Sequence, residues 1–289
     1  MEISIPTNNA YSAMGHGRSD YDAFYGVTEE MNFLSWHCHD FYELYIHLQG
    51  AEYYSVDNNT YRLKPNQLLI IPPFRMHGLM MNKKLTRYER AFIYLSPSFM
   101  KYLGCGQVDI EQMISEFTGS GRFVFDMDEE QARTCAEHIN AVHLNGENHQ
   151  PWDRFTDLSH LLPAVRIMIE AMHSSAASMP TIPANPLMSE ILGYIEEHYA
   201  EAITLKSLSD QFNISQSSLS HQFLRYTHHS VYEYILYKRI MMAKYRLIQN
   251  ETPGEAAFQC GFGDYSNFLR AFKKITGLTP SEYKQQVRL

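Results

Sequence analysis

Histidine and carboxylate side chains are concentrated in one short stretch of this sequence, HCHDFYELYIHLQG. Alternate residues of a β-strand point to the same face, so His37, His39 and Glu43 would share a face in a strand. His77 ends a second stretch, NQLLIIPPFRMH. Imidazole nitrogens and carboxylate oxygens can hydrogen-bond a small polar molecule or ligate a divalent ion. The two stretches therefore mark a candidate binding site.

The sequence around these residues predicts short strands separated by turns. YYSVDNNTYRL is typical of a hairpin whose turn is Asp57-Asn58-Asn59. NQLLIIPP is a short apolar run ended by two prolines, as in a buried strand. Strands at this spacing, between about residues 30 and 100, favour a small barrel or sandwich.

The order of the polar residues also resembles a known motif. The pattern H-x-H-x3-E-x6-G runs from His37 to Gly50, and P-x4-H ends at His77. Together they resemble the motifs of the cupin barrel. In metal-binding cupins the corresponding side chains, here His37, His39, Glu43 and His77, ligate a divalent ion. The resemblance implies a site suited to iron, manganese, zinc or nickel.

Beyond this region the sequence becomes helical. The segments that begin at Asp128 and Trp152 have helical spacing, with acidic residues in their first turns. We expect Pro163 to bend or split the second helix. Small residues and prolines then predict a linker. The expected organisation is an α+β protein with one domain at residues 1–175, a linker at 176–186 and an all-α domain at 187–289.

The all-α region contains an internal repeat. FLRYTHHSVYEY begins at Phe223 and FKKITGLTPSEY begins at Phe272, so the copies are 49 residues apart (272 − 223). Both contain Phe, a basic residue two positions later, Thr, then Ser or Thr, and Glu-Tyr. A repeat of this size indicates one supersecondary unit used twice.

Each copy lies in a predicted helix-turn-helix. Thr204 and Ser215 are typical N-caps for the two helices of the first motif, Asp264 caps the second helix of the other, and Gly277 ends it. The amphipathic helix expected at 231–249 would span nearly 30 Å, at about 1.5 Å per residue. Successive major-groove faces of B-DNA are about 34 Å apart. The spacing predicts one chain reading two consecutive grooves, and the alternative is a helical bundle that binds nothing.

Inward apolar residues identify the outward face of each predicted recognition helix. The inward residues are Leu219, Phe223, Phe268 and Phe272. Arg can bond guanine and Asn or Gln can bond adenine, so we expect Arg270, Asn267 and His221 to read bases. Each of these alone is equally well explained as a solvated surface residue. The residues expected to contact DNA are Ser217, Ser218, His221, Gln222, Arg225, Tyr265, Ser266, Asn267, Arg270 and Lys274.

Composition and charge limit the classes of function. The 289 residues are 45% hydrophobic and 19% charged, which is typical of a soluble globular protein. We expect no signal peptide and no membrane helix. The four cysteines form no CxxC pair, which favours a reducing cytoplasm. Residues up to 184 carry 13 basic and 22 acidic side chains (−9), whereas residues from Lys206 onward carry 11 and 6 (+5). A basic tail on an acidic chain favours contact with phosphates.

The tail resembles the DNA-binding domain of the AraC/XylS family of bacterial transcription regulators. The resemblance rests on GFGDYSNFLRAFKKITGLTPSEYK and ITLKSLSDQFNISQSSLSHQF and covers residues 190–286. It implies two helix-turn-helix units joined by a long helix, with recognition helices that start near Ser215 and Asp264. It also implies a cupin-like sensor barrel that binds a small molecule, often a sugar. The residues expected to contact that ligand are His37, His39, Phe41, Glu43, Tyr45 and His77.

The resemblance favours a cytoplasmic transcription activator that responds to a polar effector such as a carbohydrate. We expect it to need no cofactor and no metal. The expected partners are double-stranded DNA, the effector and a second copy of the chain, and RNA polymerase is a further candidate. The helices after the barrel resemble dimerisation helices, with a stripe formed by Ala136, Ile139, Val142 and His143, or they pack on their own barrel. A metal-dependent cupin enzyme with a DNA-binding tail and a ligand-blind DNA-binding scaffold are the alternatives.

Overall fold

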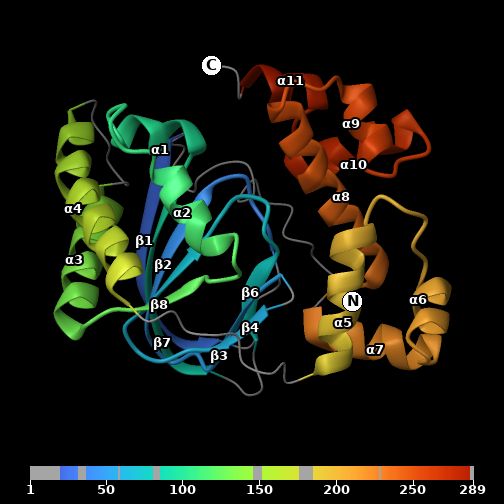
Figure 1. The fold of residues 1–289 in the computed structure, drawn as a ribbon, viewed down its shortest axis with the longest axis horizontal. Helices are drawn as coiled ribbons and strands as arrows, with labels where there is room; N and C mark the ends of the chain where they lie inside the picture. Colours follow the sequence, from blue (N-terminus) through green and yellow to red (C-terminus); the bar gives the residue numbers. More distant parts are fainter. Residues whose placement is uncertain are drawn as a thin grey trace. The chain divides into compact units, whose positions relative to one another are not determined.

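The chain folds into a β-rich unit and a helical unit (Figure 1). The computed structural model describes residues 20–31, 37–57, 59–80, 85–145, 152–175, 185–227 and 229–286. Of these, residues 20–31 and 41–175 belong to the β-rich unit, and residues 185–286 form the helical unit together with residues 37–40. The fold is α+β, as predicted. Most of the predicted linker, residues 176–184, lies outside the described residues.

The β-rich unit contains two antiparallel sheets. The larger has the order β1-β7-β2-β5-β8 and the smaller the order β4-β3-β6. The strands are β1 (Tyr21–Met31), β2 (Tyr42–Gln49), β3 (Tyr53–Val56), β4 (Asn59–Arg62), β5 (Gln67–Ile71), β6 (His77–Met80), β7 (Leu85–Leu95) and β8 (Val124–Asp126). The predicted hairpin is confirmed as β3 and β4, where Val56 lies opposite Asn59. The predicted buried strand is confirmed as β5, whose residues are all buried.

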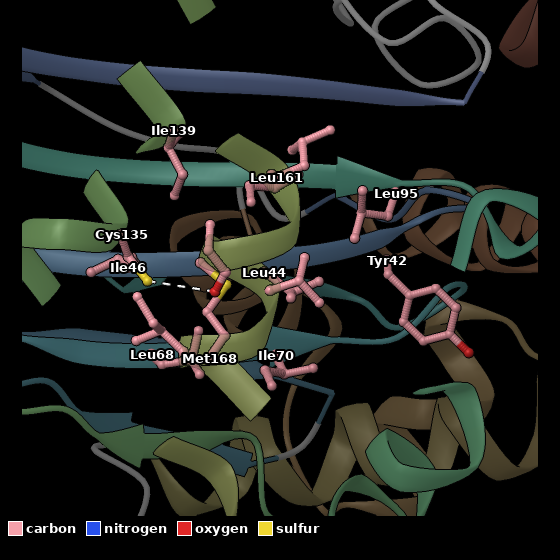
Figure 2. Packing of buried hydrophobic residues seen from close by; sticks show 14 of the residues in the cluster. Tyr42, Leu44, Ile46, Leu68, Ile70, Leu95, Cys135, Ile139, Leu161 and Met168 are labelled. Carbon is pink, nitrogen blue, oxygen red and sulfur yellow. Dashed lines mark hydrogen bonds between the residues drawn. The ribbon is translucent and has the colours of Figure 1, made fainter. Parts of the chain in front are cut away.

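Strand β2 is buried on both faces. Tyr42, Leu44 and Ile46 pack in a hydrophobic cluster with helices of the same unit (Figure 2). Tyr45 points to the opposite face and packs with Leu69 and other residues of a second cluster. Because successive side chains of a strand alternate between faces, the odd-numbered residues of β2 lie between the two sheets. Glu43 is therefore directed into the barrel.

Four helices complete the β-rich unit: α1 (Pro97–Leu103), α2 (Ile110–Thr118), α3 (Glu129–Asn145) and α4 (Asp153–Ser174). Helices α3 and α4 pack on each other beside the larger sheet (Figure 1), and Cys135 Sγ donates to the carbonyl oxygen of Ala164 at 3.6 Å (Figure 2). Pro163 was expected to bend or split this segment; it lies inside one continuous helix, which rules out the split.

The proposed dimerisation stripe on α3 is used inside the unit. Ala136, Ile139 and Val142 are buried in the same cluster as β2. The ring of His143 lies 5.3 Å from that of Phe24, on β1. The outer face of a sheet needs an apolar cover, and α3 supplies it. The alternative in which these residues pack on their own barrel is therefore correct.

The helical unit has seven helices over the described residues: α5 (Pro186–His198), α6 (Leu205–Gln211), α7 (Gln216–Thr227), α8 (Val231–Ile248), α9 (Pro253–Gln259), α10 (Tyr265–Thr276) and α11 (Pro280–Gln286). The predicted N-caps are confirmed, because Thr204 accepts from the backbone N–H of Ser207 and Asp264 from that of Asn267. Gly277 is the predicted C-cap, at φ +77°. No helix of the described residues has the length and hydropathy needed to cross a bilayer.

Candidate DNA-binding surface and ligand site

The repeated pattern positions two recognition helices by the same contacts. Phe223 on α7 and Phe272 on α10 are fully buried. The hydroxyl of Thr227 bonds to the carbonyl oxygen of Phe223 at 2.8 Å, and that of Thr276 bonds to the carbonyl oxygen of Phe272 at 2.8 Å. These bonds tie each threonine side chain to the backbone of the last turn of its recognition helix.

The second half of the repeat begins the next helix in each copy. Ser230 and Glu233 form a reciprocal capping box at the start of α8. Glu282 accepts from the backbone N–H of Thr279 at 2.7 Å at the start of α11. The Tyr that follows each Glu is buried, and its ring packs against the repeated Phe. Packing and capping therefore account for the Phe, Thr, Ser/Thr, Glu and Tyr positions.

The basic position of the repeat has no such structural role in the described contacts. Arg225 and Lys274 are exposed, and each lies two residues after a buried Phe on its recognition helix. Cations toward the C-terminal end of a recognition helix commonly meet phosphate. This position is a candidate backbone contact in both motifs.

Helix α7 presents a polar outer face. Ser217 and His221 are exposed, and Ser218 and Gln222 are half-buried. Gln222 Nε2 donates to Ser218 Oγ at 2.9 Å, so these two side chains are bonded to each other one turn apart. The inward residue Leu219 is fully buried. The structure places all five predicted residues of α7, including Arg225, on the side away from the core.

Helix α10 presents a more basic outer face. The five predicted residues Tyr265, Ser266, Asn267, Arg270 and Lys274 are all exposed, and Arg270 donates to the side-chain oxygen of Asn267. Lys273 is exposed beside Lys274 and was missed by the sequence analysis, although its distance of three residues from Arg270 puts both on neighbouring helical positions.

Helix α8 connects the two motifs. It has 18 residues, which corresponds to about 27 Å at about 1.5 Å per residue. Its buried residues include Tyr234, Ile240 and Leu247, so the helix is packed against its neighbours from its first turn to its last. The dimension is close to the spacing of consecutive major-groove segments.

The candidate ligand site centres on a buried acid and histidine. Glu43 on β2 and His77 on β6 come from different sheets, and Glu43 Oε2 lies 3.1 Å from His77 Nε2. Both side chains are nearly inaccessible. The predicted ligand residues His37 and His39 precede this strand; His39 is buried and His37 half-buried.

One step of the sequence argument for this cluster is wrong. His37 and His39 precede β2, which begins at Tyr42, so strand alternation does not align them with Glu43.

Aromatic rings line the barrel beside Glu43. The ring of Tyr45 lies 5.5 Å from that of Tyr54, and the ring of Tyr54 is stacked with His77 at 6.3 Å. The hydroxyl of Tyr45 bonds to that of Tyr88, and Phe41 packs against Tyr94 at 4.4 Å. The sequence analysis named Phe41 and Tyr45 and missed the others, because their position depends on strand pairing.

Burial keeps the phenols of this lining neutral. It raises the pKa of Tyr45, and the neighbouring Tyr88 raises it further. Burial also raises the pKa of Tyr54, followed by the charge of Glu43. Neutral hydroxyls can donate and accept hydrogen bonds. The lining therefore offers polar tips and apolar ring faces to a small molecule.

The glycine of the cupin-like pattern is a steric requirement. Gly50 has φ +103°, and a Cβ there would lie 2.4 Å from the carbonyl oxygen of Arg87. Any side chain here would displace β7, so we attribute this glycine to the close approach of the backbone to β7 rather than to contact with a ligand.

A separate surface cavity of about 400 Å³ lies elsewhere on the β-rich unit. Its lining includes Tyr102, Leu103, Leu158 and Leu162. None of the predicted ligand residues contributes to it.

Two family models match this chain. One describes an AraC-like ligand binding domain and covers residues 25–109, and the other describes a helix-turn-helix domain and covers residues 208–286. The chain belongs to the AraC family of transcription regulators. As an AraC-family member it is a DNA-binding transcription factor with a ligand-binding domain and not an enzyme, so the alternative of a metal-dependent enzyme is wrong.

Relatives extend over both regions. The transcriptional activator RhaS of Enterobacter sp. (strain 638) is 22% identical over 258 residues, which are 86% of this chain and 87% of RhaS. YijO, an uncharacterized transcriptional regulator of Escherichia coli (strain K12), is 39% identical over 101 residues, 35% of this chain and 36% of YijO. The crystal structure of ToxT from Vibrio cholerae O395 aligns with 93% of this chain and 99% of its own at 13% identity, with a TM-score of 0.37.

Proposed function

We propose that this AraC-family regulator activates transcription when a small polar molecule, with carbohydrate as the first candidate, binds in its barrel. The observation that carries the proposal is the duplicated framework around Phe223 and Phe272, which leaves a basic residue and a polar helix face exposed in each copy. Activation is supported by the name of the RhaS relatives, which match over 86% of this chain at 22–24% identity.

DNA recognition is assigned to the outer faces of α7 and α10. Arg270 and Asn267 lie near the exposed start and middle of α10, where a recognition helix meets base edges. Arg270 donates to the side-chain oxygen of Asn267, and on DNA binding both side chains would bond base edges instead. His221 is the corresponding candidate on α7.

The effector is proposed to bind beside Glu43 and His77. Carboxylate and imidazole can bond hydroxyl groups, and the faces of Phe41 and Tyr45 can pack on a sugar ring. His37 and His39, which were predicted from the sequence, are proposed as further contacts of the effector.

Residues 37–40 are the proposed route by which the effector changes DNA binding. His39 belongs to the ligand set, and the next residue, Asp40, accepts a hydrogen bond from Lys244 Nζ at 2.8 Å and another from Tyr283 Oη at 2.8 Å. The segment thus carries ligand candidates and an anchor to α8 and α11. An effector that favours one conformation of the segment would shift the population of DNA-binding states by its difference in affinity.

The protein is proposed to act in the cytoplasm as a homodimer that contacts RNA polymerase at its promoters. With the α3 stripe buried, the apolar residues exposed on α4 support self-association: Phe155 is 77% and Leu162 48% exposed. They are seven residues apart and so share one side of the helix.

A binding experiment tests the DNA-binding assignment. The full chain is titrated against the promoter region beside its own gene and against random DNA of equal length. Arg270→Ala is expected to weaken specific binding by about 1–3 kcal/mol and to relax sequence preference. Unchanged affinity and unchanged sequence preference would show that Arg270 does not read a base.

A thermal-shift screen with a carbohydrate panel tests the effector, because a ligand that binds the native state raises the stability of that state.

A further inference from the structure

We propose that Arg239 is a positioning residue that fixes the two helix-turn-helix motifs relative to each other, and so sets the spacing of the base sequences that they read together. Its guanidinium contacts the loop that leads into the first motif (residues 199–204) and the turn of the second motif (residues 260–264). All of these residues belong to the helical unit. The consequence for DNA rests on the proposed function, whereas the contacts of Arg239 do not.

The side chain of Arg239 bonds the loop at two points. Arg239 is half-buried in the middle of α8. Its Nε donates to the carbonyl oxygen of Tyr199 at 2.7 Å, and its Nη2 donates to that of Glu201 at 2.6 Å. Helix α5 ends at His198, and the carbonyl groups at the end of a helix lack helical partners, so an arginine is well suited to bond them. The two bonds fix the path of the chain from α5 into the first motif.

The turn of the second motif contacts the same arginine and the same loop. The guanidinium carbon of Arg239 lies 6.0 Å from the ring centroid of Phe262, within the range of a cation–π contact. A Cβ at Gly261 would lie 2.3 Å from the carbonyl oxygen of Ala200, so the backbone of the turn passes directly against the loop. Gly261 also has φ +81°, which glycine adopts readily. The loop and the turn are therefore in direct contact beside Arg239.

Phe262 connects this contact to the second recognition helix. Its ring lies 5.1 Å from that of Phe268, a fully buried residue of α10. Helices α7 and α10 both pack on α8, which sets their positions along that helix. The contacts of Arg239 add a direct connection between the loop before α6 and the turn before α10. Rotation of one motif about α8 relative to the other would break these contacts, so they hold the relative orientation of the two motifs.

A fixed orientation has a consequence for recognition. When two binding modules are joined rigidly, the second binds at a high effective concentration, but only on a site whose spacing matches. One extra base pair moves the second groove segment by about 3.4 Å and turns it by about one tenth of a turn. Motifs held at one orientation would reject such a site, whereas motifs that move independently would tolerate it. Arg239 thus contributes to specificity without itself reading a base.

A distance measurement tests the contacts of Arg239 without DNA. Spin labels are attached to the full chain through Ser217→Cys on α7 and Ser266→Cys on α10, both exposed positions, after the exposed Cys105 has been replaced by Cys105→Ser. Double electron–electron resonance then gives the distribution of distances between the two recognition helices. We expect one narrow distribution when Arg239 is present and a broader one in Arg239→Gln.

Two further variants separate positioning from general stability. Arg239→Lys keeps the charge but lacks the planar fork that reaches two carbonyl oxygens, so it should broaden the distribution less than Arg239→Gln, and it stays informative if the glutamine variant fails to fold. Thr276→Val removes hydrogen bonds at the end of α10 that do not involve the loop, and should lower the unfolding temperature with the distances unchanged. A broad distribution in the wild type, narrow distributions in both Arg239 variants, or equal broadening in Thr276→Val would overturn the positioning role.

The spacing of the DNA site supplies the second readout. The bases that the full chain protects in the promoter region beside its own gene are placed in a short duplex, and a second duplex carries one extra base pair between the two groove segments. The wild type should bind the second duplex about 100-fold more weakly, the low end of the gain from a matched linkage, and Arg239→Gln should reduce this ratio to about tenfold or less. Lower stability alone would weaken binding to both duplexes by the same factor.

The two readouts fail separately. An unchanged ratio in Arg239→Gln would overturn the role of Arg239 in spacing specificity. Wild-type protein that shows the expected distances but no sequence-specific DNA binding would refute the proposed function and support the positioning role of Arg239.

Discussion

Thr227 and Thr276 stand 49 residues apart and have the same three hydrogen-bond partners. Each hydroxyl lies within hydrogen-bond distance of the carbonyl oxygen four residues before it and of the carbonyl oxygen two residues after it, which share its single proton, and it accepts from the backbone N–H two residues after it. Both side chains are buried. One threonine thus ends a recognition helix and fixes the exit of the chain from it, and the duplication preserved that geometry in both motifs.

We expect Thr276→Val to destabilise the helical unit, and Thr227→Val to do the same. Valine keeps the shape but removes the hydroxyl that bonds the part-buried backbone N–H two residues later, at a cost of about 1–3 kcal/mol. Urea unfolding followed by circular dichroism measures the change. Ser281→Ala, at an exposed position of α11, is the control and should be neutral. A valine variant as stable as wild type would show that the hydrogen bonds of the threonine hydroxyl do not contribute to stability.

Arg225→Gln and Lys274→Gln should weaken binding to specific and random DNA by the same factor. A side chain that contacts only phosphate carries no sequence information, and its loss reduces the slope of log affinity against log salt by about 1. Fluorescence anisotropy across a salt series measures that slope. Lys101→Gln removes an equal charge from an exposed position of the β-rich unit and should leave the slope unchanged. A change in sequence preference would reassign these residues to base reading.

The helical unit was largely predictable because its signals are local. Thr204, Asp264 and Gly277 act on backbone groups within one turn, so residue type and position suffice to place them. The barrel hairpin at Asp57 was predictable for the same reason. The outward residues of α7 and α10 followed from helical period and the inward apolar residues.

The rest depends on contacts between residues far apart in sequence. Tyr54 and Tyr88 join the barrel lining only once β3 and β7 are placed in their sheets. The apolar stripe on α3 was equally consistent with a dimer interface and with packing on the sheet, because either arrangement would bury the same residues. The anchor formed by Asp40 and Lys244 spans 204 residues (244 − 40) and leaves no pattern in the sequence.

Phe155→Ser should weaken self-association. Phe155 is 77% exposed on α4, so its replacement costs the isolated chain little, whereas an interface would lose a buried aromatic ring. Sedimentation velocity over a concentration series is expected to show a shift toward monomer. Phe258→Ser removes an equally exposed ring from the helical unit (80%) and serves as the control. An unchanged dimer would place the interface elsewhere.

Asp40→Asn should destabilise the helical unit strongly. Lys244 is fully buried and its Nζ lies 2.8 Å from Asp40 Oδ2, so the substitution removes a negative charge beside a buried ammonium, at a cost on the order of 3–5 kcal/mol. Combining it with Lys244→Met removes the ammonium and should recover much of the loss. Chemical unfolding of both proteins measures this. A double variant no more stable than the single one would mean that the ion pair is not the cause.

The same pair predicts a specific dependence on pH. Burial acts to raise the pKa of Asp40, but the charge of Lys244 and hydrogen bonds from Lys244 and Tyr283 oppose it, and the net pKa is lowered. A carboxyl whose pKa is lower in the folded state stabilises the protein above its unfolded pKa, about 3.9, and that contribution disappears as pH falls through the folded value. The difference in unfolding free energy between wild type and Asp40→Asn should therefore be constant from pH 7 to about pH 5 and shrink below about pH 4. Urea titrations at pH 7, 5, 4 and 3.5 measure it. A difference that already shrinks between pH 7 and 5 would indicate that the pKa of Asp40 is raised in the folded state.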